Sequence, residues 1–596
     1  MTRCNAQTKR FGIATLVGSF ALLVCLAVAD GQWGNITRIA LSPDGAEGND
    51  QSDGNGVTPD GSFVLFSSRA TNLVNEDTGG HSQVYLRDLR NSTTVLVSRA
   101  TDGTPGNRMS WGMGMSSDGR YVAFASLASN LVPNDTNGVW DIFVHDVVSG
   151  TTERVSVSST GEQANGRSEV SLWNAMSADG RYVVFQSDAS NLVPGDSAGW
   201  TDIFVRDRWN GTTTRVSVTY RGGQSGGDSI NPVISANGRY VAYRSRARNL
   251  VPNDTNDEMD VFVYDLQTGA VERVSVSSSG EEANGLCIAP TISADGMRVA
   301  FPSLASNLVQ DDSNGSAADI FVHDRATRTT EVVSVSSTGV QGPHSVASFA
   351  APISPDGRYV SFRTGWSLQG GRYLRNASRT YVHDTRFGRT YVAALTWDGF
   401  EPNKECYPLA FTDSGAHLLF DTGASNVVPN DTNGVLEPFW RKLAPHASVT
   451  LAAIVHAGVA HSPFQLTFDE DDDPFEVRAV RPIDVAAPSV RVEFTTVAEE
   501  PHPTDLTLVV NDRATAGPVL RRVELFNYAT GNWDLWDVRY ATMWDTTTEV
   551  RVAQGADRYV EGGSAYMRAR ISYFDVGVNV VGWSALLDSV QWYTTR

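Results

Sequence analysis

SSDGRYVAFASLASNLVPNDTNGVWDIFVHDVVSGTTERVSV, residues Ser116–Val157, is the stretch of sequence that decides the fold. It predicts three short strands separated by turns, and its Asp-Gly turn recurs along two thirds of the chain. The turn glycines are Gly61, Gly119, Gly180, Gly238, Gly296, Gly357 and Gly415. The steps between them are 58 or 61 residues, and a fixed period of this size predicts a repeat architecture.

Two aromatic positions keep the same register in every repeat. One lies five residues after each glycine, at Phe66, Phe124, Phe185, Tyr243, Phe301, Phe362 and Phe420. The other lies 24 or 25 residues after it, at Tyr85, Phe143, Phe204, Phe262, Phe321, Tyr381 and Phe439. Apolar and β-branched residues alternate around both positions, so each repeat is predicted to be one four-stranded β unit.

The two ends of the repeat region complement each other. Residues 35–52, NITRIALSPDGAEGNDQS, match TERVSVSSTGEQANGRS at 152–168, which is the last strand and exit loop of a repeat. The seventh repeat stops near Leu443 without that strand. Pairing the first strand of the chain into the last repeat would remove both exposed edges. The sequence therefore predicts an all-β, seven-bladed β-propeller closed by strand exchange, over residues 30–443.

The segments SADGRYVVF, ASNLVPGD and DIFVRD, all within residues 177–207, resemble the TolB-like, WD40-like (PD40-type) propeller repeats of bacterial exported proteins. The resemblance covers residues 36–443. It implies the propeller fold. It also implies a binding or scaffolding role more often than an enzymatic one, because propellers of this kind are mostly binding or scaffolding modules.

Residues 444–596 carry no such period. Strand-like segments alternate with turn residues and predict a C-terminal β-sandwich. FDEDDDPFEVRAV, ELFNYATGNWDLWDVR and AYMRARISYF are similar to a C-terminal sandwich module of bacterial exported proteins. That resemblance implies an accessory role, adhesive or carbohydrate-facing.

Residues 1–29 have the pattern of a signal peptide: a basic start, an apolar run from Phe11 to Val28 and a small-x-small triplet. An uncleaved membrane anchor is the alternative. We expect an exported, periplasmic or secreted monomer with no transmembrane segment after signal removal. Its Cys287 and Cys406 are predicted to be buried free thiols, because non-adjacent blades hold them too far apart to bridge. The formal charge of −20 argues against nucleic acid as a partner.

The loop between the second and third strands repeats its polar residues. In the second repeat it contains Asp135, Asn137 and Asp141, and the first of these recurs as Asp254 and Asp431. Carboxylates and amides two residues apart, with a glycine for the bend, can bind calcium. The same residue types also build self-capping turns, and recurrence in six repeats makes a structural role the more economical reading.

The sixth repeat departs from this pattern. Its loop contains Trp366, Arg372, Tyr373, Arg375 and Arg379. Aromatic rings stack on sugars and arginines bind carboxylates, so these residues are candidate ligand-binding residues for an anion or a sugar. Docking of the C-terminal domain or simple drift of one repeat would explain them equally.

No catalytic residue is predicted. GDSAG at 195–199 is only a variant of the NDTNG of its repeat, and no zinc-binding H-E-x-x-H helix, P-loop or dinucleotide fingerprint occurs. We therefore expect an exported, non-enzymatic binding or scaffolding protein whose propeller loops contact protein or carbohydrate at the cell envelope or outside. The alternatives are a polysaccharide-acting propeller enzyme, hydrolase or lyase, and a calcium-stabilised adhesive or structural protein.

Overall fold

The computed structural model describes residues 36–443 apart from 170–173, 338, 343–350, 369–371, 374–377, 387, 395, 397–401, 413, 414, 416 and 430. Beyond residue 443 it describes the strands named below, the turn at 528–531 and one short helix. The signal peptide predicted at residues 1–29 lies outside the described residues.

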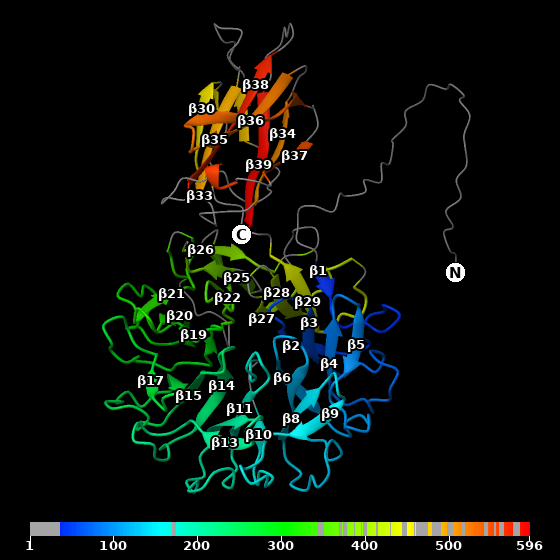
Figure 1. Cartoon of the computed structure of the whole chain (residues 1–596). Coiled ribbons are helices and arrows are strands. Elements are labelled where there is room, and N and C mark those ends of the chain that lie inside the picture. Colours follow the sequence, from blue (N-terminus) through cyan, green and yellow to red (C-terminus); the bar gives the residue numbers. More distant parts are fainter. Residues whose placement is uncertain are drawn as a thin grey trace, which may run out of the picture.

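Residues 36–442 form antiparallel sheets that follow one another around a common centre (Figure 1), and we number them blades 1 to 7 from β2 onward. Blade 1 consists of β2 (Ser52–Val57), β3 (Phe63–Ser68), β4 (Gln83–Asp88) and β5 (Thr93–Leu96), and blade 2 consists of β6 (Ser110–Met115), β7 (Tyr121–Ser126), β8 (Asp141–Asp146) and β9 (Thr151–Arg154). Blade 3 consists of β10 (Ser168–Glu169), β11 (Tyr182–Ser187), β12 (Asp202–Asp207) and β13 (Thr212–Arg215), and blade 4 consists of β14 (Ser229–Ile234), β15 (Tyr240–Ser245), β16 (Asp260–Asp265) and β17 (Val271–Arg273). The strands of blades 5 to 7 are β18 (Thr291–Ile292), β19 (Arg298–Ser303), β20 (Asp319–Asp324), β21 (Thr329–Val332); β22 (Tyr359–Thr364), β25 (Arg379–Asp384), β26 (Arg389–Val392); β27 (Cys406–Phe411), β28 (His417–Thr422), β29 (Glu437–Lys442). Blade 6 also carries a small hairpin of β23 (Trp366–Ser367) and β24 (Arg372–Tyr373). The prediction of an all-β fold built from repeated four-stranded antiparallel sheets is confirmed.

The Asp-Gly turn joins the first two strands of a blade by local hydrogen bonds. In blade 2 the Asp118 carboxylate accepts hydrogen bonds from the Ser116 hydroxyl at 2.6 Å and from the Arg120 amide at 3.0 Å. Gly119 has φ of 71°, a left-handed conformation that glycine adopts without steric cost. A second turn follows the third strand, where Asp146 accepts the amides of Val148 and Ser149. This aspartate, which the repeat also has at Asp88, Asp207, Asp265, Asp324 and Asp384, therefore stabilises the turn after the third strand.

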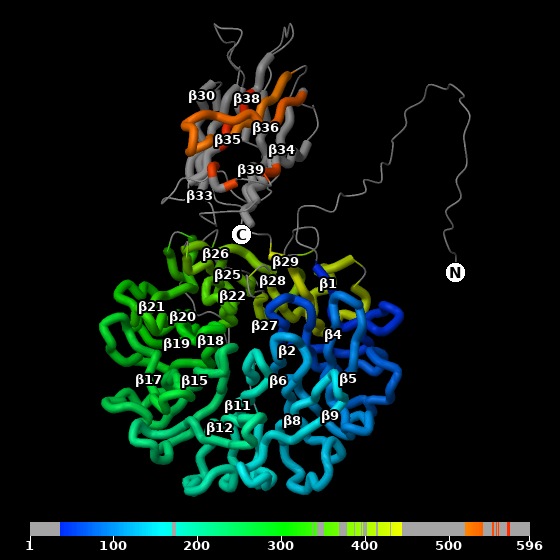
Figure 2. The backbone as a smooth tube through the Cα atoms, viewed as in Figure 1, coloured from blue at the N-terminus to red at the C-terminus, as the bar shows by residue number. Residues whose placement is uncertain are grey.

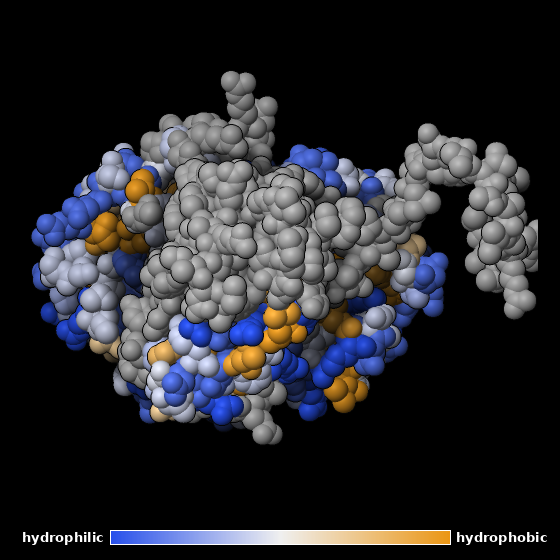
Figure 3. Space-filling model, turned by 90° about the horizontal axis from the view of Figure 1, so that it is seen from above, coloured by the Kyte–Doolittle hydropathy of each residue, from blue (hydrophilic) through white to orange (hydrophobic). Residues whose placement is uncertain are grey.

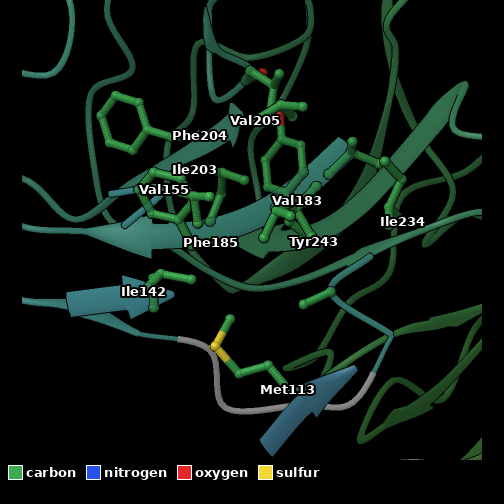
Figure 4. Packing of buried hydrophobic residues seen from close by; sticks show 14 of the residues in the cluster. Met113, Ile142, Val155, Val183, Phe185, Ile203, Phe204, Val205, Ile234 and Tyr243 are labelled. Carbon is green, nitrogen blue, oxygen red and sulfur yellow. The ribbon is translucent and has the colours of Figure 1, made fainter. Parts of the chain in front are cut away.

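The blades pack face to face through the aromatic residues of their central strands. Phe124 and Phe143 stack within blade 2 with ring centroids 5.6 Å apart, and the other blades repeat the pair. Around Phe185 and Tyr243, residues from several blades form one buried cluster (Figure 4). Because every sheet buries both faces against its neighbours, the repeating aromatic register is a packing register.

The N-terminal strand completes the last sheet. β1 (Ile36–Arg38) pairs antiparallel with β29, with Thr37 opposite Trp440. The Ile39 amide extends the ladder by donating to the Pro438 carbonyl at 3.1 Å. In the tube representation the blue start of the described chain meets the yellow strands of blade 7 (Figure 2). The pairing expected from the two sequence ends is the pairing observed.

Residues 450–595 form two five-stranded antiparallel sheets, in the orders β30-β33-β38-β35-β36 and β31-β32-β39-β34-β37. Their elements are β30 (Thr450–Ala457), β31 (Val459–Ala460), β32 (Phe475–Arg478), β33 (Val490–Val497), β34 (Asp505–Ala514), β35 (Val519–Asn527), β36 (Asn532–Ala541), β37 (Thr546–Val552), the 3-10 helix η1 (Ala556–Tyr559), β38 (Tyr566–Asp575) and β39 (Ser584–Thr595). The seven-blade count of the propeller, the β-sandwich and the domain boundary near residue 443 stay predictions.

Cys287 and Cys406 are free and buried, as predicted, and burial raises the pKa of both thiols to about 12. Among the described residues, no helix combines the length and the apolar character needed to cross a membrane. Figure 3 shows hydrophilic residues over much of the visible propeller rim, with hydrophobic residues scattered among them.

Candidate functional site

The loop aspartates that sequence reasoning selected as possible metal ligands surround an arginine. In blade 2, Arg154 Nη1 lies 3.5 Å from Asp135 and 3.6 Å from Asp141. The Gln163 amide donates to the same two carboxylates at 3.2 and 3.3 Å, and the Asn137 amide donates to Asp141 at 2.8 Å. The structure thus brings the predicted residues together, with a guanidinium between the two carboxylates.

Blades 3, 4 and 7 repeat this arrangement, which we call the arginine clamp. In blade 4, Arg273 Nη1 lies 3.7 Å from Asp254, 3.4 Å from Asp260 and 2.6 Å from Glu282. One oxygen of each of these three acids lies within 4.8 Å of the others. Burial raises the pKa of Asp254 to about 6.

In blade 7 the clamp arginine comes from the N-terminal strand. Arg38 lies 3.3 Å from Asp431 and 2.8 Å from Glu437, and it also pairs with Glu47. A cation that bound to any of these carboxylate sets would have to displace a guanidinium. Calcium at Asp135, Asp254 or Asp431 stays a prediction, and the clamp supplies a structural reason for the repeated acids.

The repeated asparagine of the same loop has a capping role. In blade 2, Asn130 Oδ1 accepts the Asn107 amide at 2.9 Å, and its amide group donates to the Pro105 carbonyl at 2.9 Å. Asn72 and Asn307 make the same pair of bonds in blades 1 and 5. The self-capping interpretation is thereby supported for these asparagines.

The sixth-blade residues predicted to bind a ligand lie on the β23–β24 hairpin and on β25. Trp366 is half-buried, packs against the core of blades 5 and 6, and its ring lies against Gly342. Arg379 is the first residue of β25, in the position that Asp141 occupies in blade 2. Its guanidinium donates to the Ser367 hydroxyl at 3.5 Å. Arg372 and Tyr373 form β24, while Arg375 lies outside the described residues.

A neighbouring cluster was missed in part by sequence reasoning. The Arg363 guanidinium donates to Glu405 at 2.6 Å and lies over the Tyr407 ring, 4.2 Å from its centroid. Glu405 also accepts hydrogen bonds from the Ser378 hydroxyl at 3.0 Å and the Tyr407 hydroxyl at 3.1 Å. Tyr407 is 40% exposed, in the same register as Trp111, which is 37% exposed. An aromatic eight residues before the turn glycine was the available signal.

Two carboxyl groups lie near each other where blade 1 meets blade 7. Both oxygens of the buried Asp421 accept the Gly54 amide, at 3.0 and 3.1 Å. Burial, followed by the charge of Asp53, raises the pKa of Asp421 well above its ordinary range. Burial also raises the pKa of Asp53, against hydrogen bonds from Gln51. Sequence reasoning missed this pair, although Asp421 stands out in a position that is Ser67 in blade 1 and Gln186 in blade 3.

Comparison with known proteins finds no matching family model and no matching curated protein. Similar solved structures include TolB from Acinetobacter baumannii, with 16% identity over 58% of this chain and 64% of that chain, at a TM-score of 0.30. The Cps50 (Swd1) β-propeller domain of Myceliophteria thermophila is 12% identical over 69% of this chain and all of that chain, at 0.34. A puromycin-hydrolyzing peptidase of Mycobacterium tuberculosis is 12% identical over 79% of this chain and 63% of that chain, at 0.37.

At these identities each likeness concerns the fold alone, and less than two thirds of the TolB and peptidase chains is spanned. The fold assignment therefore comes from this chain's own strand pairings, which show an all-β protein built from repeated antiparallel sheets.

Proposed function

We propose that this protein is a non-enzymatic binding or scaffolding protein that contacts a protein or carbohydrate through the region where blades 6 and 7 meet. The observation that carries the proposal is the cluster of Arg363, Glu405 and Tyr407 beside the β23–β24 hairpin. The aligned positions in the other blades repeat neither the hairpin nor this combination of charges and ring.

The chemistry of the cluster suits recognition. An exposed tyrosine presents a flat apolar face with a polar tip, which stacks on sugar rings and packs against protein side chains. The arginine beneath it is held by Glu405, so both groups are oriented before a ligand arrives. The described loop acids of blades 2, 3, 4 and 7 are held by clamp arginines, which favours a structural role over proton transfer for them.

Glycan arrays and cell-envelope fractions, probed with the mature chain and the variant Y407A/E405Q, test the proposal. The matched control is Y220A, which removes a tyrosine that is 50% exposed on a different blade. We expect binding to fall about tenfold or more in Y407A/E405Q, in the range of one lost anchor residue, and to persist in Y220A. Equal binding by all three proteins would exclude this region.

A polysaccharide-acting enzyme is the second candidate, because Asp53 and Asp421 form a carboxyl pair with raised pKa values. One protonated and one ionised carboxyl are what a glycosidase or lyase needs for general acid and base. Incubating the protein and its D53N variant with envelope polysaccharides and measuring new reducing ends or unsaturated products tests this candidate. Turnover that D53N abolishes would establish it, and the absence of products would remove it.

Export to the periplasm or beyond, and a monomeric state, belong to the same proposal. They agree with the signal-like residues 1–29 and the charge of −20. Fractionation of cells that express the full chain, followed by N-terminal sequencing and light scattering, tests both. Recovery of uncleaved protein in the cytoplasm would contradict export.

A further inference from the structure

The interfaces between blades 2 and 3 and between blades 4 and 5 share an arginine arrangement. Arg208 of blade 3 pairs with Glu153 of blade 2 at 2.7 Å, and its guanidinium lies 4.4 Å from the centroid of the Tyr121 ring. It also donates to the Gly180 carbonyl at 2.5 Å, and its side chain is only 10% exposed. The guanidinium fills the space between the two blades.

Blades 4 and 5 repeat this arrangement with different residues. Arg325 pairs with Glu272, lies 4.2 Å from the centroid of the Tyr240 ring, and donates to the Gly296 carbonyl at 2.5 Å. In both interfaces, the acid on the fourth strand of one blade therefore pairs with the arginine that follows the third strand of the next blade. Where the fourth-strand residue is uncharged, so is the residue at the partner position: these are Val95 and Val147 for blades 1 and 2, and Thr214 and Leu266 for blades 3 and 4.

The interface between blades 5 and 6, formed by β20, β21 and β25 (green in Figure 1), breaks this match. Glu331 occupies the position of Glu153, but Thr385 occupies the position of Arg208. Blade 5 also has Met297 and Arg298 where blade 2 has Arg120 and Tyr121. A thinner side chain therefore stands where the tyrosine ring would be.

Arg298 is engaged by its surroundings. It donates to the Gly357 carbonyl at 3.1 Å and to the Thr385 hydroxyl at 3.0 Å, and it pairs with Asp324 at 3.3 Å. Among the described residues, no hydrogen bond or ion pair to the Glu331 carboxylate is found; burial raises the pKa of Glu331, and the nearby charge of Arg298 opposes that rise. The result is an open pocket of about 360 Å³ lined by Arg298, Val322, Asp324, Thr327, Thr329, Glu331 and Thr385.

A charge count across the interfaces shows what the pocket lacks. Between blades 2 and 3, Arg120 and Arg208 pair with Asp146 and Glu153. Between blades 4 and 5, Arg239 and Arg325 pair with Asp265 and Glu272. Between blades 3 and 4, Arg181 pairs with Asp207. Blades 5 and 6 set Arg298 alone against Asp324 and Glu331. These three interfaces balance, and the interface between blades 5 and 6 is short of a single cation.

We propose that the pocket between blades 5 and 6 binds the side chain of an arginine from a partner polypeptide. The guanidinium would lie beside that of Arg298, which already donates to the Gly357 carbonyl and the Thr385 hydroxyl, with Glu331 as its carboxylate and the hydroxyls of Thr327 and Thr329 as acceptors. Arg120 and Arg208 lie together near Tyr121, and Arg239 and Arg325 lie together near Tyr240, so an interface of this kind can hold two guanidinium groups. The site is separate from the Arg363–Glu405–Tyr407 cluster and does not depend on its function.

The probe is the blocked tripeptide acetyl-Gly-Arg-Gly-amide, with acetyl-Gly-citrulline-Gly-amide as its neutral isostere, followed by calorimetry or by NMR shifts. We expect saturable binding of the arginine peptide and at least tenfold weaker binding of the citrulline peptide. E331Q should reduce arginine binding about tenfold or more, the usual effect of losing a charged hydrogen-bond partner. E153Q, which alters an interface that already contains its arginine, is the matched control and should bind like the parent.

T385R gives a second, independent readout because it restores the arginine of the matched interfaces. We expect this variant to have a higher unfolding midpoint than the parent and to lose peptide binding, since its own guanidinium then occupies the pocket. Retained binding in T385R, equal binding of the two peptides, or no saturable binding at millimolar peptide would each overturn the proposal.

Discussion

At the scale of single residues, the turn glycines meet two demands at once. Gly180 has φ of 72°, and a Cβ placed on it would lie 2.5 Å from Cδ2 of Tyr121 in the preceding blade. Gly119, Gly238, Gly296 and Gly415 show the same close approach to an aromatic ring. The turn is therefore also the contact by which one blade packs on the next, which explains why glycine recurs there without exception.

The substitution G180A should separate these two demands. Alanine at φ of 72° is strained, and its methyl group collides with a ring that is fixed by packing, so we expect a loss of about 3 kcal/mol in the free energy of unfolding. The control is G138A, where φ is 68° but nothing lies within 4 Å, and where about 1 kcal/mol of backbone strain alone is expected. Denaturant titration measures both, and equal losses would contradict the contact argument.

Asp319 gives a second prediction at this scale. It is 1% exposed in blade 5, and burial raises its pKa to about 6. The unfolded chain has an ordinary aspartate pKa of about 3.9, so between these values the folded state binds more protons than the unfolded state. The stability contributed by this group is therefore fully present below about pH 4 and is lost as the pH rises to about 6.

We accordingly expect the parent to lose about 3 kcal/mol relative to D319N between pH 4 and pH 7. Urea titrations of both proteins across this range give the difference directly. A difference that stays constant with pH would show that Asp319 is ionised in the folded protein at pH 4.

At the scale of the blade, blade 5 lacks the arginine clamp that blades 2, 3, 4 and 7 have beside their loop acids. Blades 2, 3, 4 and 7 end their fourth strand with an arginine, but blade 5 has Val332 there, so Asp312 and Asp319 have no guanidinium between them among the described residues. Val332 pairs with Phe321 as Arg154 pairs with Phe143, so the register is unchanged. Blade 5 therefore lacks one positive charge that blades 2, 3, 4 and 7 have, while its strand pairing is the same.

V332R should restore the clamp. We expect it to raise the free energy of unfolding at pH 7 by about 1–2 kcal/mol, because charged hydrogen bonds to a buried carboxylate are worth that much, and to reduce the pH dependence attributed to Asp319. V392R is the matched control: it places the same side chain at the same register of blade 6, where Arg379 replaces the acid. V392R should destabilise, and stabilisation by both variants would refute the electrostatic explanation.

Sequence reasoning predicted the strands, the turns, the free thiols and the strand pairing of the two ends, because each follows from a residue type in a fixed register. It could not find the clamp, since Asp135 and Arg154 belong to different strands and meet only in the folded blade. A fixed count from the turn glycine also fails on the inner strand of blade 3: Ser168, which bonds to Ser187, lies twelve residues before Gly180, whereas Ser110, which bonds to Ser126, lies nine residues before Gly119. The three extra residues of that repeat shift the register locally.

The candidate ligand residues also show that the repeat pattern does not predict contacts between neighbouring blades. Trp366 stood out in the sequence because it interrupts a repeat, and the structure gives it a packing contact with Gly342. Glu405 and Tyr407 lie in the next repeat, so their proximity to Arg363 follows only from the way neighbouring blades pack. A period identifies what each position does within a blade, but not which positions of two blades meet.

At the scale of the whole molecule, ring closure depends on one strand and one arginine. β1 supplies the outer strand of blade 7, and its Arg38 is the clamp for the buried Asp431 and Glu437. Removing the strand therefore exposes the edge of β29 and leaves two buried carboxyl groups without their cation. Closure should be cooperative, because hydrogen bonding and charge compensation are lost together.

A chain that begins at Pro43 should unfold at a lower temperature by several degrees, since breaking a buried ion pair alone costs about 3–5 kcal/mol. The full-length R38Q variant keeps the strand and loses only the charge, so it should show part of this loss. A synthetic peptide of residues 34–44, added in trans, should restore the midpoint of the shortened chain, whereas the same peptide carrying glutamine for Arg38 should restore less. Differential scanning calorimetry measures all four cases. If the shortened chain unfolded at the parental midpoint, β1 would not contribute to thermal stability. The stability of the propeller would then come from the blade-to-blade contacts of the turn glycines alone.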